Sequence, residues 1–208
     1  MKYILAATTL LTIMACNNSG DTAEVSDTRE VKDTTGTVYA LDSTSTLQWK
    51  GSKPTGSHTG TFNLTGELVV NENNVAGGNF TIDIASLVNH DLTENDGKSK
   101  LEGHLKSPDF FDVAKFPSAK FVITSVTPAT SDSAGTHVVS GNLTLKDSTK
   151  NVTFPATITV DDRTISAKAD FNIDRTLWGM NYKGPNNPQD WFIRKDVNIA
   201  LNLTAKKK

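Results

Sequence analysis

The sequence predicts an all-β domain, built as a closed antiparallel barrel of about eight strands with one helical segment. Apolar and polar residues alternate along most of the chain from Val38 onward, which is typical of strands with one buried face. Clusters of Asn, Asp, Ser and Gly separate these runs. Long antiparallel strands with one apolar face require a sandwich or a barrel, and we favour the barrel because about eight strands can close around a small-ligand cavity.

The chain begins with features of a bacterial lipoprotein signal. Lys2 precedes an apolar run from Tyr3 to Ala15, which is shorter than the roughly 20 residues that a membrane-spanning helix needs. Ala15 directly precedes Cys16, as in a lipobox. We therefore expect residues 1–15 to be a signal peptide and Cys16 to be acylated, which would anchor the protein at a membrane. An ordinary secretory signal is the alternative. Asn17 favours the outer membrane, facing the periplasm.

Residues 16–37 differ in composition from the rest. They are rich in Asn, Ser, Thr, Asp and Gly, and Val25 and Val31 are their only large apolar residues. Such a segment buries too little surface to offset its ordering entropy. We expect a flexible tether here, followed by the barrel domain at residues 38–205.

Within the domain, each strand is predicted from its apolar positions, and one segment interrupts the alternation. Thr93 to Lys106 lacks a β-branched run and predicts a helix, which Ser107-Pro108 would end because the residue before proline avoids helical geometry. The apolar strand positions are Leu47, Trp49; Phe62, Leu64, Leu68, Val70; Phe80, Ile82, Ile84; Phe121, Ile123; Val139, Leu143, Leu145; Val152, Phe154, Ile158, Val160; Ile165, Phe171, Ile173; and Ile193, Val197, Ile199, Leu201, Leu203.

Charge and composition argue against several classes of function. The net charge is −2 without a sustained basic block, so we expect no nucleic-acid partner. The single cysteine excludes an internal disulfide and a multi-cysteine metal site. No two of the four histidines have close metal-ligand spacing, and no phosphate loop, nucleophile elbow or dinucleotide motif occurs. We therefore expect no metal and no cofactor.

Paired carboxylates are the remaining route to catalysis. Asp109, Asp112, Asp174 and Asp190 could supply a pair for glycoside hydrolysis. Nothing in their spacing selects that role over helix capping and ion pairs. We expect a protein that is not an enzyme, and a hydrolase using these aspartates is the alternative to test.

Several sequence blocks resemble the YceI-like family. They occur in the family's order across about residues 38–205: Trp49-Lys50-Gly51-Ser52-Lys53, His58-Thr59-Gly60, Gly103-His104-Leu105-Lys106-Ser107-Pro108-Asp109-Phe110-Phe111-Asp112, Lys115-Phe116-Pro117-Ser118-Ala119-Lys120-Phe121, Gly141-Asn142-Leu143-Thr144-Leu145-Lys146, Val152-Thr153-Phe154-Pro155-Ala156 and Ile173-Asp174-Arg175-Thr176-Leu177-Trp178-Gly179-Met180.

The resemblance implies an extended, lipocalin-like, eight-stranded barrel with the helix near one mouth. It also implies that the interior binds a polyisoprenoid-type amphiphile, including isoprenoid quinones or their precursors. The lipobox and tether depart from the usual periplasmic members of the family, which puts free shuttling of the ligand in doubt. Expected roles are an envelope lipid carrier, a store or a stress-related binding protein. A structural or interaction module with a solid core is the alternative.

Alternation and motif position select the candidate site. We expect the lipid and, through Cys16, the membrane as partners, and we leave open whether the chain forms a homodimer. The candidate lining residues are Phe62, Leu64, Phe80, Ile82, Phe121, Leu143, Phe154, Phe171 and Trp178. The candidates near the mouth are His104, Asp109, Arg175 and Tyr182.

Overall fold

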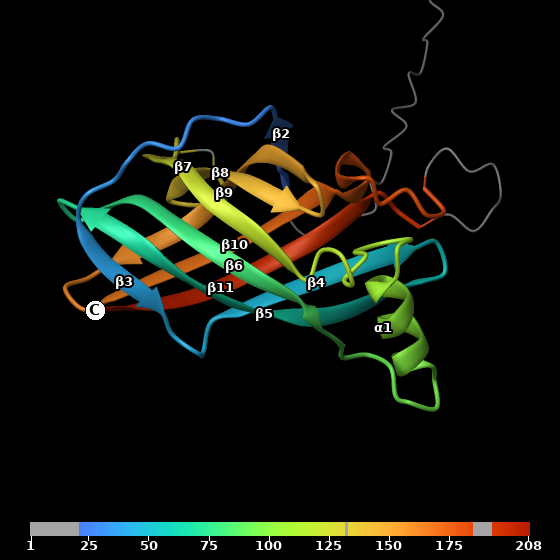
Figure 1. The fold of residues 1–208 in the computed structure, drawn as a ribbon. Helices are drawn as coiled ribbons and strands as arrows, with labels where there is room; N and C mark the ends of the chain where they lie inside the picture. Colours follow the sequence, from blue (N-terminus) through green and yellow to red (C-terminus); the bar gives the residue numbers. More distant parts are fainter. Residues whose placement is uncertain (1–20, 132, 185–192) are drawn as a thin grey trace, which may run out of the picture.

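The fold is a closed antiparallel barrel, as the sequence predicts (Figure 1). The computed structural model describes residues 21–131, 133–184 and 193–208. Each strand from β5 to β11 pairs with the next along the chain, and β11 returns to pair with both β3 and β4. Because β3 and β4 follow one another along the same edge, between β11 and β5, they share one position in the wall. The barrel therefore has eight strand positions.

The barrel strands vary in length, and the longest are the neighbours β5 and β6 with 16 residues each. In chain order the strands are β3 (Thr37–Leu41), β4 (Thr46–Lys53), β5 (Gly56–Asn71), β6 (Asn74–Asn89), β7 (Ser118–Pro128), β8 (His137–Leu145), β9 (Ser148–Val160), β10 (Thr164–Asp174) and β11 (Asp196–Lys207).

Local sequence explains how these long strands are formed. Along β6, the buried residues Phe80, Ile82 and Ile84 alternate with exposed polar residues, so one face of the strand points into the barrel. Glu72 and Asn73 link β5 to β6 with positive φ angles of 48° and 67°. Two such residues make the tight turn whose twist matches a hairpin.

One end of the barrel carries the longer connections, and we call it the α1 mouth. It holds the turn between β4 and β5, the segment 90–117 with helix α1 (Lys98–Lys106), and residues 175–184 with the 3₁₀ helix η1 (Arg175–Trp178). It lies at the right of Figure 1.

Helix α1 begins five residues later than the expected Thr93. Gly97 precedes it with a φ of 93°, and the Thr93 hydroxyl bonds to Asp96 at 2.5 Å, so this stretch is a turn. The helix ends before Ser107-Pro108 as predicted, with Ser107 in an extended conformation. None of the helices in the described residues has the length and apolar composition required to span a bilayer.

The expected flexible tether is wrong for residues 21–26. Strand β1 (Asp21–Thr22) pairs in parallel with β10, and β2 (Glu24–Ser26) pairs antiparallel with β9. Composition did not predict this because backbone hydrogen bonds hold the segment, and they do not depend on side-chain type. Residues 1–20, which include the signal peptide and Cys16, lie outside the described residues.

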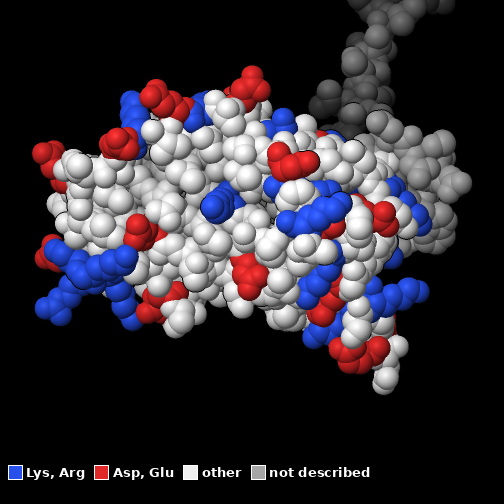
Figure 2. Space-filling view, viewed as in Figure 1, with Lys and Arg blue, Asp and Glu red and all other residues white. Residues whose placement is uncertain are grey.

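Most charged side chains lie on the outside of the barrel. Figure 2 shows basic and acidic residues scattered over the visible face. The inside is apolar, and buried hydrophobic residues from the barrel strands form one continuous cluster. Because apolar side chains face the interior, the interior is the part of the barrel that is suited to an apolar ligand.

Candidate functional site

The barrel encloses a cavity of about 360 Å³. Inward-pointing side chains of every strand from β4 to β11 line it, and α1 contributes Leu101, His104 and Leu105. This volume lies within the range of sites that bind small organic ligands. The expectation of a solid core, which belonged to the structural-module alternative, is therefore wrong.

The cavity wall contains most of the side chains that the alternation pointed to. It includes Phe62, Leu64, Phe80, Ile82, Phe121, Leu143, Phe154 and Phe171. The expectation that Trp178 lines the cavity is wrong. Trp178 is 1% exposed and its indole N–H donates to the Leu143 carbonyl at 3.3 Å. The reason is that β10 ends at Asp174 and η1 begins, so the alternation of a strand no longer holds.

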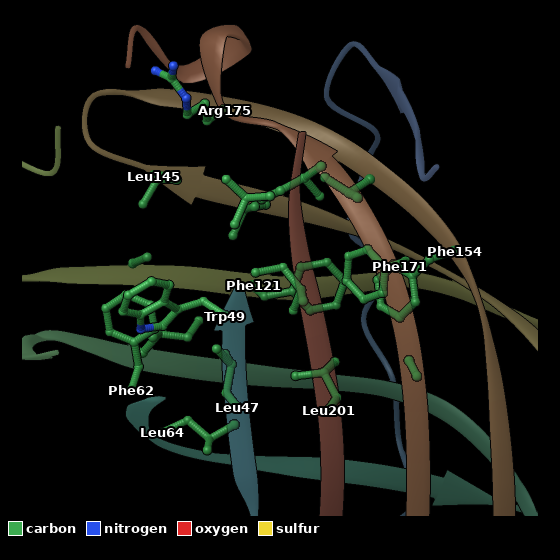
Figure 3. A pocket seen from close by; sticks show the side chains of 18 of the residues that line it. Leu47, Trp49, Phe62, Leu64, Phe121, Leu145, Phe154, Phe171, Arg175 and Leu201 are labelled. Atoms are coloured by element: carbon green, nitrogen blue, oxygen red, sulfur yellow. The ribbon is translucent and has the colours of Figure 1, made fainter. Parts of the chain in front are cut away.

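A row of aromatic rings forms one side of the cavity (Figure 3). Phe80 and Phe121 have ring centroids 6.3 Å apart, Phe121 and Phe154 5.9 Å, and Phe154 and Phe171 4.0 Å in a stacked arrangement. A Cβ at Gly141 would lie 2.2 Å from the Phe121 ring, so only glycine lets that ring lie against the wall. The row gives a continuous apolar surface across β6, β7, β9 and β10.

A second ring cluster lies at the α1 mouth. The His104 ring contacts Tyr182 edge-on at 4.7 Å and Phe110 at 5.2 Å, and its Nε2 lies 3.0 Å from Asp109 Oδ2. His104 and Phe110 line the cavity, whereas Asp109 and Tyr182 do not and instead contact His104. Three of the four residues expected at the mouth are thus brought together, namely His104, Asp109 and Tyr182. Their contacts link α1 to the segment after η1.

Arg175, the fourth, lines the cavity but is mainly a support for its own loop. It is 3% exposed, and burial lowers the pKa of its guanidinium from the ordinary value, with nearby Asp174 opposing that shift. Nε donates to the carbonyl of Arg194 at 3.1 Å, and Nη2 donates to those of Tyr182 and Ile193 at 3.1 and 3.0 Å. Nη1 donates to the Met180 carbonyl. Little donor capacity is left for a ligand.

The ends of β4 and β5 on either side of their connecting turn supply polar lining residues that we did not predict as site residues. Ser52, Lys53 and His58 line the cavity there. His58 Nδ1 lies 2.8 Å from Asp91 Oδ2. Partial burial would raise the pKa of Asp91, but hydrogen bonds from the Thr59 N–H and from His58 and Asn89 outweigh it and lower the pKa to about 2. The carboxylate thus holds the imidazole in place at the rim.

Other lining residues were also missed. Leu101 and Leu105 lie one helical turn apart on α1, and this spacing could have identified them. Leu47, Trp49 and Leu201 belong to strands that the alternation found, and were left out although they face inward. Among the described residues, no aspartate or glutamate lines the cavity.

The aspartates considered for catalysis have structural partners. Asp112 pairs with Lys115 at 3.2 Å. Asp174 accepts from the N–H and hydroxyl of Thr176 at 3.0 and 2.6 Å and so begins η1. Asp190 lies outside the described residues. Within the described part of the chain, no three His, Cys, Asp or Glu residues are grouped so that they could hold a metal ion.

Comparison with known sequences identifies related proteins. The model of the YceI-like domain matches residues 39–205. A UPF0312 protein of Pseudomonas putida strain W619 is 34% identical over 139 residues, which are 62% of this chain and 70% of that protein. A UPF0312 protein of Pseudomonas fluorescens strain SBW25 is 39% identical over 106 residues. That match covers 50% of this chain and only 53% of the relative's own length.

Solved structures share the fold at low sequence identity. BcnA of Burkholderia cenocepacia has a TM-score of 0.62 and 22% identity, and the match covers 79% of this chain and 98% of BcnA. A polyisoprenoid binding domain from Saccharophagus degradans has a TM-score of 0.61 and 17% identity, covering 82% of this chain and 98% of that domain. These likenesses agree with the barrel described above.

Proposed function

This chain belongs to the YceI-like domain family, and we propose that its barrel binds an amphiphilic lipid of the polyisoprenoid type. The hydrocarbon tail occupies the cavity and the head group lies at the α1 mouth. The observation that carries the proposal is the cavity of about 360 Å³ with an almost wholly apolar lining. The name of the Saccharophagus degradans neighbour, a polyisoprenoid binding domain, supports the choice of ligand class.

The physical basis is burial of hydrocarbon. Each Å² of apolar surface removed from water contributes about 25 cal/mol, so a long tail gains affinity without any reacting group. The aromatic row of Phe80, Phe121, Phe154 and Phe171 offers flat faces against which an unsaturated chain can pack.

The chemistry of the mouth restricts the head group. The polar lining there comes from Ser52, Lys53, His58, His104 and Arg175, and no carboxylate faces the cavity within the described residues. A cationic head group would contact no carboxylate on the described lining of the cavity. A hydroxyl, a quinone or an anionic head group finds hydrogen-bond donors instead. Isoprenoid alcohols, isoprenoid quinones and their precursors all satisfy this condition.

At the level of the cell, we infer a binding protein without catalytic activity and without a cofactor, anchored by an acylated Cys16 to the outer membrane of a bacterial envelope and facing the periplasm. In that place it acts as a lipid carrier, as a store or in a stress response. The lipobox-like end of the apolar run at Ala15-Cys16 motivates the anchor. Mass spectrometry of the mature N-terminus tests it, and an unmodified or uncleaved Cys16 would contradict it.

The binding proposal is tested by identifying the lipid that co-purifies with the protein and by titrating the delipidated protein with candidate ligands. Protein purified from a native host without detergent is extracted and analysed by mass spectrometry, and we expect an isoprenoid lipid. Delipidated protein is then titrated with a polyprenol, an isoprenoid quinone and a cationic amphiphile of matched chain length. The first two should bind and the third more weakly. Recovery of only ligand-free protein, together with no uptake of polyprenol or quinone, would refute the proposal.

A further inference from the structure

The barrel wall has a weak seam between β9 and β10. These strands have 13 and 11 residues but pair through only four, Ile165–Lys168 with Thr157–Val160. By contrast, β10 and β11 pair through eleven residues. The next positions on β9 include Pro155, which has no N–H to donate to a neighbouring strand. Beyond the hairpin end, the two strands no longer bond to each other.

The N-terminal segment fills the space between the separated strands. Thr22 of β1 pairs with Asn172 on β10, and Val25 of β2 pairs with Val152 on β9. Between them, Ala23 is 6% exposed and its N–H donates to the Asn172 carbonyl at 2.9 Å. Residues 21–26, which we call the seam strand, therefore complete the wall. Figure 1 shows β2 beside β9, with the following chain crossing the outside of the barrel towards β3.

The cavity reaches the seam from inside. Val152 and Phe154 line it from β9, and Ala169 and Phe171 line it from β10. Lys168 also lines the cavity although it is exposed to solvent, and it is the last residue of β10 that pairs with β9. The cavity thus extends to the outer surface where the ladder between the two strands ends.

The seam strand is held by few backbone pairs, and its release would expose polar groups as well as the small apolar side chains of Ala23 and Val25. It makes two residue pairs with β10 and three with β9. The chain after it is exposed, and Arg29 is joined to the barrel by two bonds between its backbone and the Asn142 amide, at 3.0 and 2.7 Å. The outward side chains beneath include Ser140 and Asn151, which bond to each other at 2.7 Å. Water can satisfy such groups once the segment leaves, so release leaves few polar groups unpaired.

We propose that the seam strand is a removable part of the wall, and that the hydrocarbon ligand enters and leaves sideways between β9 and β10 when this strand detaches. The inference rests on the proposed function. The α1 mouth is the competing route, and the ring cluster of His104, Phe110 and Tyr182 lies at that mouth. Asp21 follows Cys16 by five positions, a stretch of chain that spans at most about 18 Å. An acylated Cys16 would therefore keep the seam close to the bilayer, the source of the lipid.

A reversible disulfide that fixes the seam strand to β9, which we call the lock, tests the lateral route. In a chain with Cys16→Ser, the pair Glu24→Cys and Thr153→Cys joins β2 to β9 at registered antiparallel positions, where a disulfide can form. A short-chain isoprenoid quinone is the probe, and quenching of Trp49 in the cavity wall reports its binding. Stopped-flow mixing and displacement by excess polyprenol give the association and dissociation rates. We expect oxidation to slow both rates at least tenfold while Kd stays within threefold, and reduction to restore them.

Two further variants make the result specific. Thr46→Cys with Asn202→Cys places the same bond at exposed, registered positions of β4 and β11, which remain paired, and should leave both rates unchanged. Ala23→Glu puts a charge at a buried position of the seam strand and should speed exchange at least threefold.

Normal binding with exchange that neither the lock nor Ala23→Glu alters would overturn the lateral route and assign entry to the α1 mouth, leaving the proposed function intact. Absence of equilibrium binding in the unmodified chain would overturn both.

Discussion

Filling the cavity from its wall is the most direct test of the proposed binding mode. Ala167 lies on β10, points into the cavity, and is registered with Ile158 of β9 and Leu203 of β11. Ala167→Phe adds six ring carbons to space that ligand carbons would occupy. At about 0.8 kcal/mol for each buried CH₂, displacing two ligand carbons costs about 1.6 kcal/mol and displacing six about 5 kcal/mol. We expect Kd for the quinone or polyprenol to rise by roughly 10-fold to 3,000-fold.

The same substitution should leave the fold intact. Because the ring enters empty space, we expect the free energy of unfolding in urea to change by less than about 1 kcal/mol. Ser166→Phe is the matched control, since Ser166 is the exposed neighbour on the same strand and its side chain points away from the cavity. Titration by tryptophan quenching gives Kd for both variants. A folded Ala167→Phe protein that binds as tightly as Ser166→Phe would show that the ligand does not occupy this cavity.

Three other substitutions address the supports of the site. Arg175→Lys should lower the free energy of unfolding by about 3 kcal/mol or more, because one ammonium cannot reach the carbonyls that the guanidinium bonds; an unchanged urea midpoint would contradict this support role. The pKa of Asp91, lowered from 3.8 to about 2, means that its carboxylate stabilises the fold above about pH 4 and that this contribution is lost as the pH falls towards 2. Asp91→Asn should therefore flatten the acid side of the stability profile, and an equally steep profile would disprove the assignment. Gly141→Ala should cost about 1 to 3 kcal/mol in urea unfolding because its Cβ collides with Phe121, and a loss below about 0.5 kcal/mol would contradict the packing described.

The barrel could be predicted because the same alternation of apolar and polar residues recurs in each of its strands. Alternation along Phe80, Ile82 and Ile84 and its counterparts fixed which face of each strand is buried, and a period of two leaves a strand only two orientations. The same logic placed eight of the nine expected lining residues in the cavity wall. It failed at Trp178, where the chain leaves strand geometry and side-chain direction no longer alternates.

Other features depend on distant contacts that local pattern does not contain. Arg175 looks like a head-group ligand in the sequence, yet its N–H groups are used by carbonyls up to 19 residues away. The pairing of residues 21–26 with β9 and β10 depends on a gap between strands more than 120 residues later in the chain. Pro155 lies in the part of β9 that does not pair with β10, but nothing in the local sequence indicates which segment fills the space there.

The seam strand also bears on where this domain can be shortened. The family match begins at residue 39, after the seam strand, so a chain cut at that boundary would keep every barrel strand from β4 onward and lose β1 and β2. The bare backbone groups of Val152 and Phe171 would then form two unprotected edges, and such edges recruit strands from other molecules. We expect this shortened protein to self-associate in a concentration-dependent way, whereas a version beginning before Asp21 would stay dispersed.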